Sequence, residues 1–510
     1  PLCTYRIANF KTASADKDAG AAFLKYKDFK PYVDYFNSME DENIAQAIPN
    51  ARASQWMEEN IPLFECSQKN FEEMYYYRWW TLRKHIKETP VGYGMTEFLV
   101  NRSYADKYNL IACAIGHHIY ESRWLRNPEY LNQIIHTWYR GNEGGPMAKM
   151  TKFSSWNADA VLGRYMVDGN KEFLLDMVKD LEAEYARWEK TNRLSNGLYW
   201  QGDVQDGMEE SISGGRRKQY ARPTINSYMY GNAKALSLIG IMTGDEGMAM
   251  KYGLKADSIK TLVQDKLWNT DHHFFETMRG DASAEVREAI GYIPWYFNLP
   301  DASSQYDVAW KEVMDEKGFS APYGLTTAER RHPEFRTHGV GKCEWDGAIW
   351  PFASAQTLTA MANFMNNYPQ TVLTDSVYFH HMERYVESQH HRGRPYIGEY
   401  LDEVTGYWLK GDQERSRYYN HSTFNDLMIT GLIGLRPRMD NTVEVNPLIP
   451  EGKWDYFCLD NVLYHGRNLT ILWDKDGSRY QRGKGLHIYV DGKEVGHADT
   501  LTRVLCENVL

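Results

Sequence analysis

The chain lacks the long apolar runs and the basic clusters that mark two large classes of protein. No apolar segment reaches the ~18 residues that a membrane-spanning helix requires. With 58 basic and 68 acidic residues the net charge is −10, and no run of lysine and arginine is long enough to follow a phosphate backbone. The sequence therefore argues against a membrane span and against a nucleic-acid partner.

Cysteine is scarce, and its spacing argues against a structural zinc site. The six cysteines lie far apart without a CxxC pair, and any disulfides among them cannot be paired from sequence. The first residues, PLCTYRIANF, also lack an initiator methionine and a signal-peptide core. We therefore expect a mature or trimmed form of a secreted or periplasmic protein, with no bound metal and no other cofactor.

Aromatic residues, by contrast, are abundant. The chain has 36 Tyr, 16 Trp and 19 Phe, which together make up 14% of its residues. Such rings stack on the apolar faces of sugars, but they also build protein cores. The aromatic excess suggests a carbohydrate enzyme without establishing one.

Helical patterns dominate the region from residue 67 to residue 435. Apolar residues recur at spacings of three and four in segments such as NPEYLNQIIHTWYRG and KEFLLDMVKDLEAEYARWEKT. We expect roughly ten to twelve helices there and hardly any strands. Because no sequence period repeats, successive helical hairpins fit a closed (α/α) toroid better than an open solenoid.

The pattern changes near residue 440. LTILW, LHIYVDGKEV and TLTRVL are typical of short strands, with an Asp-Gly turn before Lys493. The expected fold class is thus all-α, a toroid with a small C-terminal β appendage. Three parts are predicted: an N-terminal extension of uncertain structure (1–60), a helical catalytic barrel (61–438), and a small β domain packed on the barrel (439–510).

Two acidic segments carry the candidate chemistry. WQGDVQDGMEESISGG places Asp203, Asp206, Glu209 and Glu210 within eight positions, and GEYLDEVTG holds Glu399 between Gly and Tyr. Hydrolysis of a glycosidic bond needs one carboxylic acid to protonate the leaving oxygen. A second carboxylate must activate water or attack the anomeric carbon. In a helical toroid such groups come from loops at one rim, so segments far apart in sequence can meet.

Four segments together resemble a known family. GLYWQGDVQDGMEESISGG resembles the DG…SGMDNS loop of the inverting trehalases, processing α-glucosidases and mannosylglycerate-hydrolase-like enzymes. CEWDGAIWPF is similar to their RGP-W-P segment, and GEYLDEVTG to their E-Y-N-P-E-T-G segment. HSTFNDLMITGLIGLRP followed by VEVNPLIP resembles the end of their helical domain. These matches lie in family order over about residues 197–450, and imply a six-hairpin (α/α)6 barrel with inverting chemistry.

The resemblance also implies roles for individual carboxylates. Glu209 falls on the general-acid position, where the family mostly has Asp, and Glu399 falls on the general-base position. Asp206 stays an alternative acid, because one methylene moves a carboxyl group by about 1.5 Å. An inverting pair should stand roughly 6.5–9.5 Å apart. Aromatic surroundings and neighbouring carboxylates should raise the pKa of the acid.

Other candidates flank these motifs or stand at helix starts. The residues expected to contact substrate are Trp200, Asp203, Arg222, Trp345, Trp156, Asp159, His117 and His421. Each also has a structural alternative. Tryptophans and histidines can belong to the core, Arg222 can hold a catalytic carboxylate, and Ser154 or Ser155 can cap the helix that begins near Trp156. The acidic loop lacks the ligand order of an EF-hand, so it is not expected to bind a metal.

The sequence thus predicts an exo-acting, inverting glycoside hydrolase that releases a terminal sugar from an oligosaccharide or polysaccharide fragment. A polysaccharide lyase or a sugar epimerase on the same toroid is one alternative, with His117, Tyr199 and His421 available as acid and base. A non-catalytic carbohydrate-binding protein is another. Neither the sugar nor the oligomeric state follows from the residues.

Overall fold

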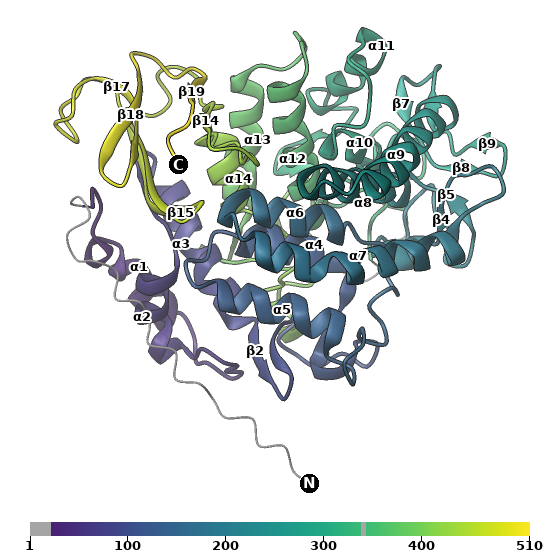
Figure 1. Cartoon of the computed structure of the whole chain (residues 1–510), viewed down its shortest axis with the longest axis horizontal. Coiled ribbons are helices and arrows are strands. Elements are labelled where there is room, and N and C mark those ends of the chain that lie inside the picture. The colour runs from purple at the N-terminus through teal and green to yellow at the C-terminus, as the bar shows by residue number, and fades with distance from the viewer. Residues whose placement is uncertain (1–21, 338–342) are drawn as a thin grey trace.

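The computed structural model describes residues 22–337 and 343–510 of the chain, so Cys3 and the rest of residues 1–21 of the predicted N-terminal extension lie outside the described residues. The described part of that extension is helical. It contains α1 (Lys30–Ser38) and α2 (Asn50–Asn60), both of which contact α3 (Lys69–Lys84). Phe36 of α1 is fully buried, with its ring 5.3 Å from that of Tyr77 in α3. Apolar packing therefore joins the segment to the helical body (Figure 1).

Six helical segments contact one another in cyclic order. Each touches the next along the chain, and the last touches the first. They are α4 (Ile115–Ser122), α6 (Asn157–Asp168), α8 (Pro223–Thr243), α10 (Ile293–Tyr296), α12 (Pro351–Asn367) and α14 (Asn425–Leu427). α8 is buried along most of its length. A helix that is buried on all sides belongs to the interior of a packed bundle.

Four further helices are half-exposed and lie around these six (Figure 1). They are α5 (Pro128–Arg140), α7 (Lys171–Asn192), α9 (Glu246–Lys266) and α13 (Asp375–Ser388). In α9 the buried residues are Met248, Tyr252, Ala256, Ile259 and Val263, which recur every three or four positions. This single apolar stripe is the pattern of a helix that packs on one face only.

Small hairpins separate the helices, which the sequence pattern did not predict. Four are independent pairs: β2 (Ile86–Thr89) with β3 (Gly92–Met95), β6 (Trp268–Asn269) with β7 (Phe274–Phe275), β10 (Ser320–Ala321) with β11 (Gly324–Leu325), and β12 (His390–His391) with β13 (Arg394–Pro395). A small sheet has the order β4 (Trp200–Gln201), β5 (Tyr220–Ala221), β8 (Met278–Arg279) and β9 (Ala282–Ser283). These strands are too short to show alternation in the sequence. The chain is therefore mostly helical, with small sheets, rather than all-α.

The C-terminal strands form an antiparallel sheet together with one strand from the N-terminal part of the chain. The sheet has the order β1 (Leu63–Cys66), β15 (Tyr456–Tyr464), β16 (Arg467–Asp474), β17 (Gly485–Val490) and β18 (Lys493–Ala498). Separately, β14 (Val443–Val445) pairs with β19 (Val504–Cys506). Asp491 and Gly492 both have positive φ, so the predicted Asp-Gly hairpin turn is present.

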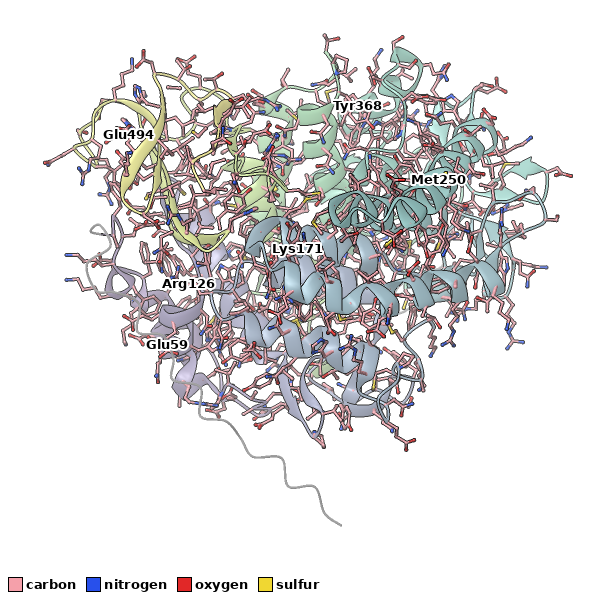
Figure 2. All side chains as sticks on the ribbon, in the orientation of Figure 1. Glu59, Arg126, Lys171, Met250, Tyr368 and Glu494 are labelled. Carbon is pink, nitrogen blue, oxygen red and sulfur yellow. The ribbon has the colours of Figure 1, made fainter. Side chains whose placement is uncertain are left out.

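Most of the aromatic excess builds the core. Trp79, Trp124, Trp138, Trp295 and Trp310 are each 1% exposed or less. Charged side chains such as Glu59, Lys171 and Glu494 point outward instead (Figure 2). None of the helices within the described residues is both long and apolar enough to cross a membrane.

Candidate active site

The loop that carries Glu209 is shaped by a tight turn. A single 3-10 turn spans Asp203–Asp206 and ends at Gly207, whose φ of +73° suits glycine. The Met208 N–H then donates to the Asp203 carbonyl over 2.9 Å. The turn reverses the chain, so that Glu209 follows it directly.

Glu209 sits in a protected, acidic environment. Burial, together with the negative charges of Glu399 and Asp203, raises the pKa of its carboxyl group to about 7. The expected direction of the shift is therefore found. This electrostatic effect requires Glu399 to lie nearby, although the two residues are 190 positions apart. Glu209 is partly exposed, so its carboxyl group remains reachable.

Glu399 is held by two cations. The Arg415 guanidinium donates to both carboxylate oxygens, at 3.2 and 2.9 Å, and Lys410 Nζ lies 3.2 Å from Oε2. The Glu399 backbone N–H donates to Ser416 Oγ over 3.3 Å. Only 4% of Glu399 is exposed, so this carboxylate faces the interior. The two cations and Ser416 hold this carboxyl group in a fixed orientation, as the role of a general base requires.

Glu97 is a third carboxyl group of the same site. Tyr419 Oη donates to one of its oxygens and Cys113 Sγ to the other, at 3.3 Å for the thiol. Burial raises the pKa of Glu97 to about 8, and the charges of Glu399 and Glu209 contribute to the rise. At neutral pH, Glu97 is therefore largely a neutral acid beside two ionisable carboxyl groups.

Asp206 is held in a buried ion pair. Arg222 Nε donates to Asp206 Oδ2 over 2.6 Å, Ser154 Oγ donates to Oδ1 over 2.7 Å, and Thr224 Oγ1 also donates to Oδ2. The side chains of Asp206 and Arg222 have no exposed surface. This geometry favours Glu209 over Asp206 as the acid, because Asp206 already accepts three hydrogen bonds. Arg222 holds this carboxylate rather than Glu399.

Aromatic rings form a stack that leads to Glu399. Trp345 stacks on Trp350 with ring centroids 4.5 Å apart, and Trp350 stacks on Tyr400 at 4.6 Å. Leu401 and Ile349 exchange two backbone hydrogen bonds of 3.0 Å, which places the Glu399 segment beside the start of α12. Trp345 Nε1 lacks a hydrogen-bond partner among the described residues. A buried donor in this state fits a group that binds a ligand.

His117 and His421 meet at the ring of Phe352. Their ring centroids lie 4.5 and 5.8 Å from that ring, and Trp156 packs 5.1 Å from His117. Burial lowers the pKa of both histidines. Neither ring nitrogen of either histidine has a hydrogen-bond partner within the described part of the chain. Tyr199, the third group available for lyase or epimerase chemistry, lies instead beside Glu189 of α7.

One predicted substrate contact, Asp159, lies elsewhere, and one predicted cap is wrong. The Asp159 carboxylate accepts from Tyr120 Oη over 2.6 Å and lines a separate cavity. Trp200 lies in β4, next to Ala221 of β5. The N-cap of α6 is Trp156 rather than Ser154 or Ser155. Both serines are engaged by carboxylates instead, Ser154 by Asp206 and Ser155 by Glu184.

The residues that surround Glu209 and Glu399 were not identified from the sequence. Lys410 and Arg415 stand between two recognised segments, so their position was a usable signal. Glu97 gave no signal, because it lies in a stretch without periodicity. Its backbone C=O accepts from the Asn420 N–H over 2.9 Å, which joins that stretch to the segment of Tyr419.

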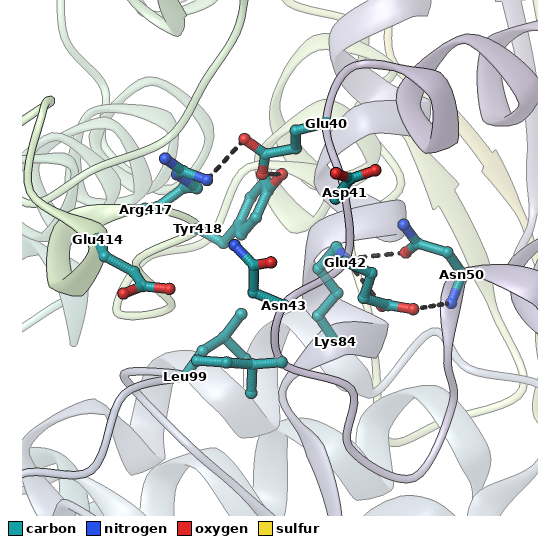
Figure 3. A pocket seen from close by; sticks show the side chains of 11 residues that line it. Glu40, Asp41, Glu42, Asn43, Asn50, Lys84, Leu99, Glu414, Arg417 and Tyr418 are labelled. Atoms are coloured by element: carbon teal, nitrogen blue, oxygen red, sulfur yellow. Dashed lines mark hydrogen bonds and ion pairs between the residues drawn. The ribbon is translucent and has the colours of Figure 1, made fainter.

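A pocket is lined by Glu414, Arg417 and Tyr418, which belong to the same loop as Arg415 (Figure 3). Arg417 donates to Glu40 over 2.7 Å, and Tyr418 Oη donates to the other oxygen of the same carboxylate. Glu40 belongs to the segment between α1 and α2. The N-terminal segment therefore anchors the loop whose Arg415 holds Glu399.

Comparisons with known proteins agree with this site. Residues 107–422 match the family described as the mannosylglycerate hydrolase MGH1-like glycoside hydrolase domain, and residues 435–497 match the C-terminal domain of glycosyl hydrolase family 65. A solved chain named "Sialidase" is 82% identical over 97% of this chain, with a TM-score of 0.96. The match covers 46% of that chain, so the present chain spans less than half of its length.

More distant structures share the fold. A GH63 mannosylglycerate hydrolase from Thermus thermophilus, in complex with glucose, has a TM-score of 0.54 and 11% identity over 70% of this chain and 99% of its own. A GH78 rhamnosidase from a Bacillus species has a TM-score of 0.55 and 10% identity over 81% of this chain and 40% of its own. The family match extends over more than half of the sequence, and it confirms the resemblance found in the motifs. This chain belongs to the mannosylglycerate hydrolase MGH1-like family of glycoside hydrolase domains.

Proposed function

We propose that the chain is an exo-acting, inverting glycoside hydrolase in which Glu209 is the general acid and Glu399 the general base. The observation that carries this proposal is the contrast between the two carboxyl groups. Burial and negative neighbours favour the protonated form of Glu209, whereas the carboxyl group of Glu399 lies against the two cations Lys410 and Arg415. Two titratable groups whose surroundings act in opposite directions are the mark of an acid and a base.

The reaction then needs no covalent intermediate. Glu399 takes a proton from water, whose oxygen attacks the anomeric carbon. Glu209 gives its proton to the glycosidic oxygen as the bond from that oxygen to the anomeric carbon breaks. Afterwards Glu209 is ionised and Glu399 protonated, so solvent must exchange one proton before the next turnover. Water attacks from the face opposite the leaving group, which inverts the anomeric centre.

The cyclic contacts of the six inner helices support an (α/α)6 toroid. Of these, α4, α6, α8 and α12 all start beside the site. Cys113 precedes α4, Ser154 precedes α6, Arg222 precedes α8 and Trp350 precedes α12. Ring closure gathers these starts at one end of the barrel. Family segments that lie far apart in the sequence can then supply residues to one site.

Action at a chain end is supported by the enclosure of the site. Trp345, Tyr400 and Glu399 are at most 4% exposed. A site whose carboxyl group and rings are this enclosed admits a terminal sugar more readily than the middle of a polymer. The names of the relatives do not fix the sugar of this chain, since one fold can serve many substrates.

Paired substitutions test the assignment. In Glu399→Gln, and in Glu209→Gln for substrates with poor leaving groups, turnover should fall by about 10²–10⁴-fold while sugar binding persists. Asp206→Asn should instead lower stability, because it leaves the buried Arg222 without its anion. Products formed in ¹⁸O-water should carry the label at the anomeric carbon. Full activity of Glu399→Gln, or products without the label, would contradict hydrolysis by this pair.

A further inference from the structure

A second cavity is lined by residues of the inner helices α4, α6, α8 and α12. Its volume is about 360 Å³. α8 starts just after Arg222, which pairs with Asp206, and it lines the cavity with Lys234, which lies roughly 16 Å further along the helix axis. α12 likewise starts after Trp350 and lines the cavity with Asn363. Along α8 and α12 these lining residues lie about three helical turns beyond the helix starts, whereas Asp159 lines the cavity from the first turn of α6.

Two of the ion pairs that line this cavity are already complete. Arg123 lies 2.8 Å from Asp426, and Arg438 lies 2.9 Å from Glu444. These four residues neutralise one another. They hold the walls in place and leave little net charge for a ligand.

Two further cations line the cavity without such a partner. Within residues 22–337 and 343–510, no carboxylate lies within 4.0 Å of Lys234 Nζ or of the Arg436 guanidinium. Arg436 donates only to neutral acceptors, the Thr430 carbonyl at 3.1 Å and Asn363 Oδ1 at 2.6 Å. A largely buried guanidinium with neutral partners gains from a bound anion.

Asp159 is a further acidic residue that lines the cavity. Asp159 accepts from Tyr120 and forms no ion pair among the described residues. Two unpaired cations and one unpaired carboxylate leave a balance of one positive charge. A ligand with a single negative charge matches that balance.

The remaining lining suits hydroxyl groups. Asn363 is engaged by Arg436 and by the Tyr296 carbonyl, and Asn367 Nδ2 donates to Asn298 Oδ1 over 2.8 Å. Asn298 Nδ2 and Asn367 Oδ1 are then the amide groups that can face a ligand, and Tyr296 and Phe297 present ring surface. Amides pair with hydroxyls, and rings pack against the C–H face of a sugar. The volume also lies within the range of small-ligand sites, roughly 300–1,000 Å³. Lys234 and Asn367 are exposed, so the cavity opens to solvent.

We propose that this cavity is a second binding site, for a monosaccharide that carries one carboxylate. Lys234 and Arg436 pair with the carboxylate, and Asn298 and Asn367 bind the hydroxyls. The site lies outside the catalytic machinery, and its occupation does not depend on glycoside hydrolysis.

Calorimetric titration of the full chain with D-glucuronate tests the site, with D-glucose as the neutral counterpart. Glucuronate should bind more tightly than glucose, and added salt should weaken its binding. Lys234→Gln should weaken glucuronate binding by about tenfold, as expected for the loss of one charged hydrogen bond. Lys171→Gln, which changes an equally exposed lysine on α7, should leave binding intact.

A second variant guards against misfolding. Arg436→Gln should weaken glucuronate binding to a similar extent. Lys234→Gln should keep the wild-type melting temperature and the wild-type rate of hydrolysis, which separates its loss of binding from misfolding. Equal binding of glucose and glucuronate, or unchanged binding in Lys234→Gln, would overturn the proposal. Because the titration needs no turnover, its failure is distinct from a failure of the catalytic assignment.

Discussion

The proton on Glu209 links burial directly to catalysis. Because the pKa of this group is about 7, its acid form is lost as pH rises through neutrality. kcat/KM should then fall by about tenfold per pH unit above pH 7 for substrates with poor leaving groups. Substrates whose leaving group needs no protonation should not show this alkaline fall. A pH profile that stays flat to pH 9 for both kinds of substrate would contradict the role of Glu209.

Glu97 gives a prediction on stability. Its folded-state pKa of about 8 lies above the value of 4.5 for a free side chain, so between these pH values the folded state binds the extra proton. The contribution of this group to the free energy of unfolding should therefore be complete below pH 4.5. It should decline from there toward pH 8, by up to about 1.4 kcal/mol per pH unit.

Glu97→Gln should remove that decline, because the amide keeps a neutral group in place. Denaturant titrations at pH 5 and pH 8 measure the difference. The variant should gain stability relative to the wild type as pH rises. If the two proteins differ in free energy of unfolding by the same amount at both pH values, Glu97 is ionised in the folded protein.

At the scale of elements, α4 and α6 are locked together at Gly116. A Cβ atom there would lie 2.1 Å from the buried ring of Trp156. Gly116→Ala should therefore lower the free energy of unfolding by roughly 1–3 kcal/mol or more, and displace His117 from its position beside Trp156. Gly247→Ala, in the exposed first turn of α9, should be neutral or slightly stabilising. Equal denaturation midpoints for the two variants would contradict this packing.

The sequence predicts long elements better than short ones. α7 and α12 follow from their apolar spacing, because each buries one or more faces over several turns. The hairpins such as β12 and β13 do not follow, since two-residue strands carry no period. The segment after His421 resembles the end of the family's helical domain. It forms only α14 and a π-helical turn at Met428–Leu432.

Some residues of the candidate site can likewise be predicted from local sequence, and others cannot. Glu209 and Glu399 lie in local motifs that can be read directly, whereas the Arg222–Asp206 ion pair depends on how a loop returns to the start of α8. Asp159 shares a helix start with Trp156 but faces another cavity. Contacts of this kind are set by tertiary packing, and a single sequence does not encode them in a local pattern.

At the scale of the whole molecule, the helical body and the C-terminal sheet depend on each other. β1 is an edge strand of that sheet, and the backbone N–H of His465 donates to the Val167 carbonyl of α6 over 2.8 Å. The predicted boundary near residue 438 should therefore not yield an independent barrel. A chain that ends at residue 438 should be aggregated or readily digested by protease, whereas a stable, active fragment would show that the domains are separable.

NMR spectroscopy of the sugar first released from a substrate of known anomeric configuration tests the central claim most directly. If Glu209 and Glu399 act on opposite faces of the sugar with one water between them, the nascent product has the opposite configuration and only later mutarotates. A product that is formed with the configuration of the substrate would contradict the account.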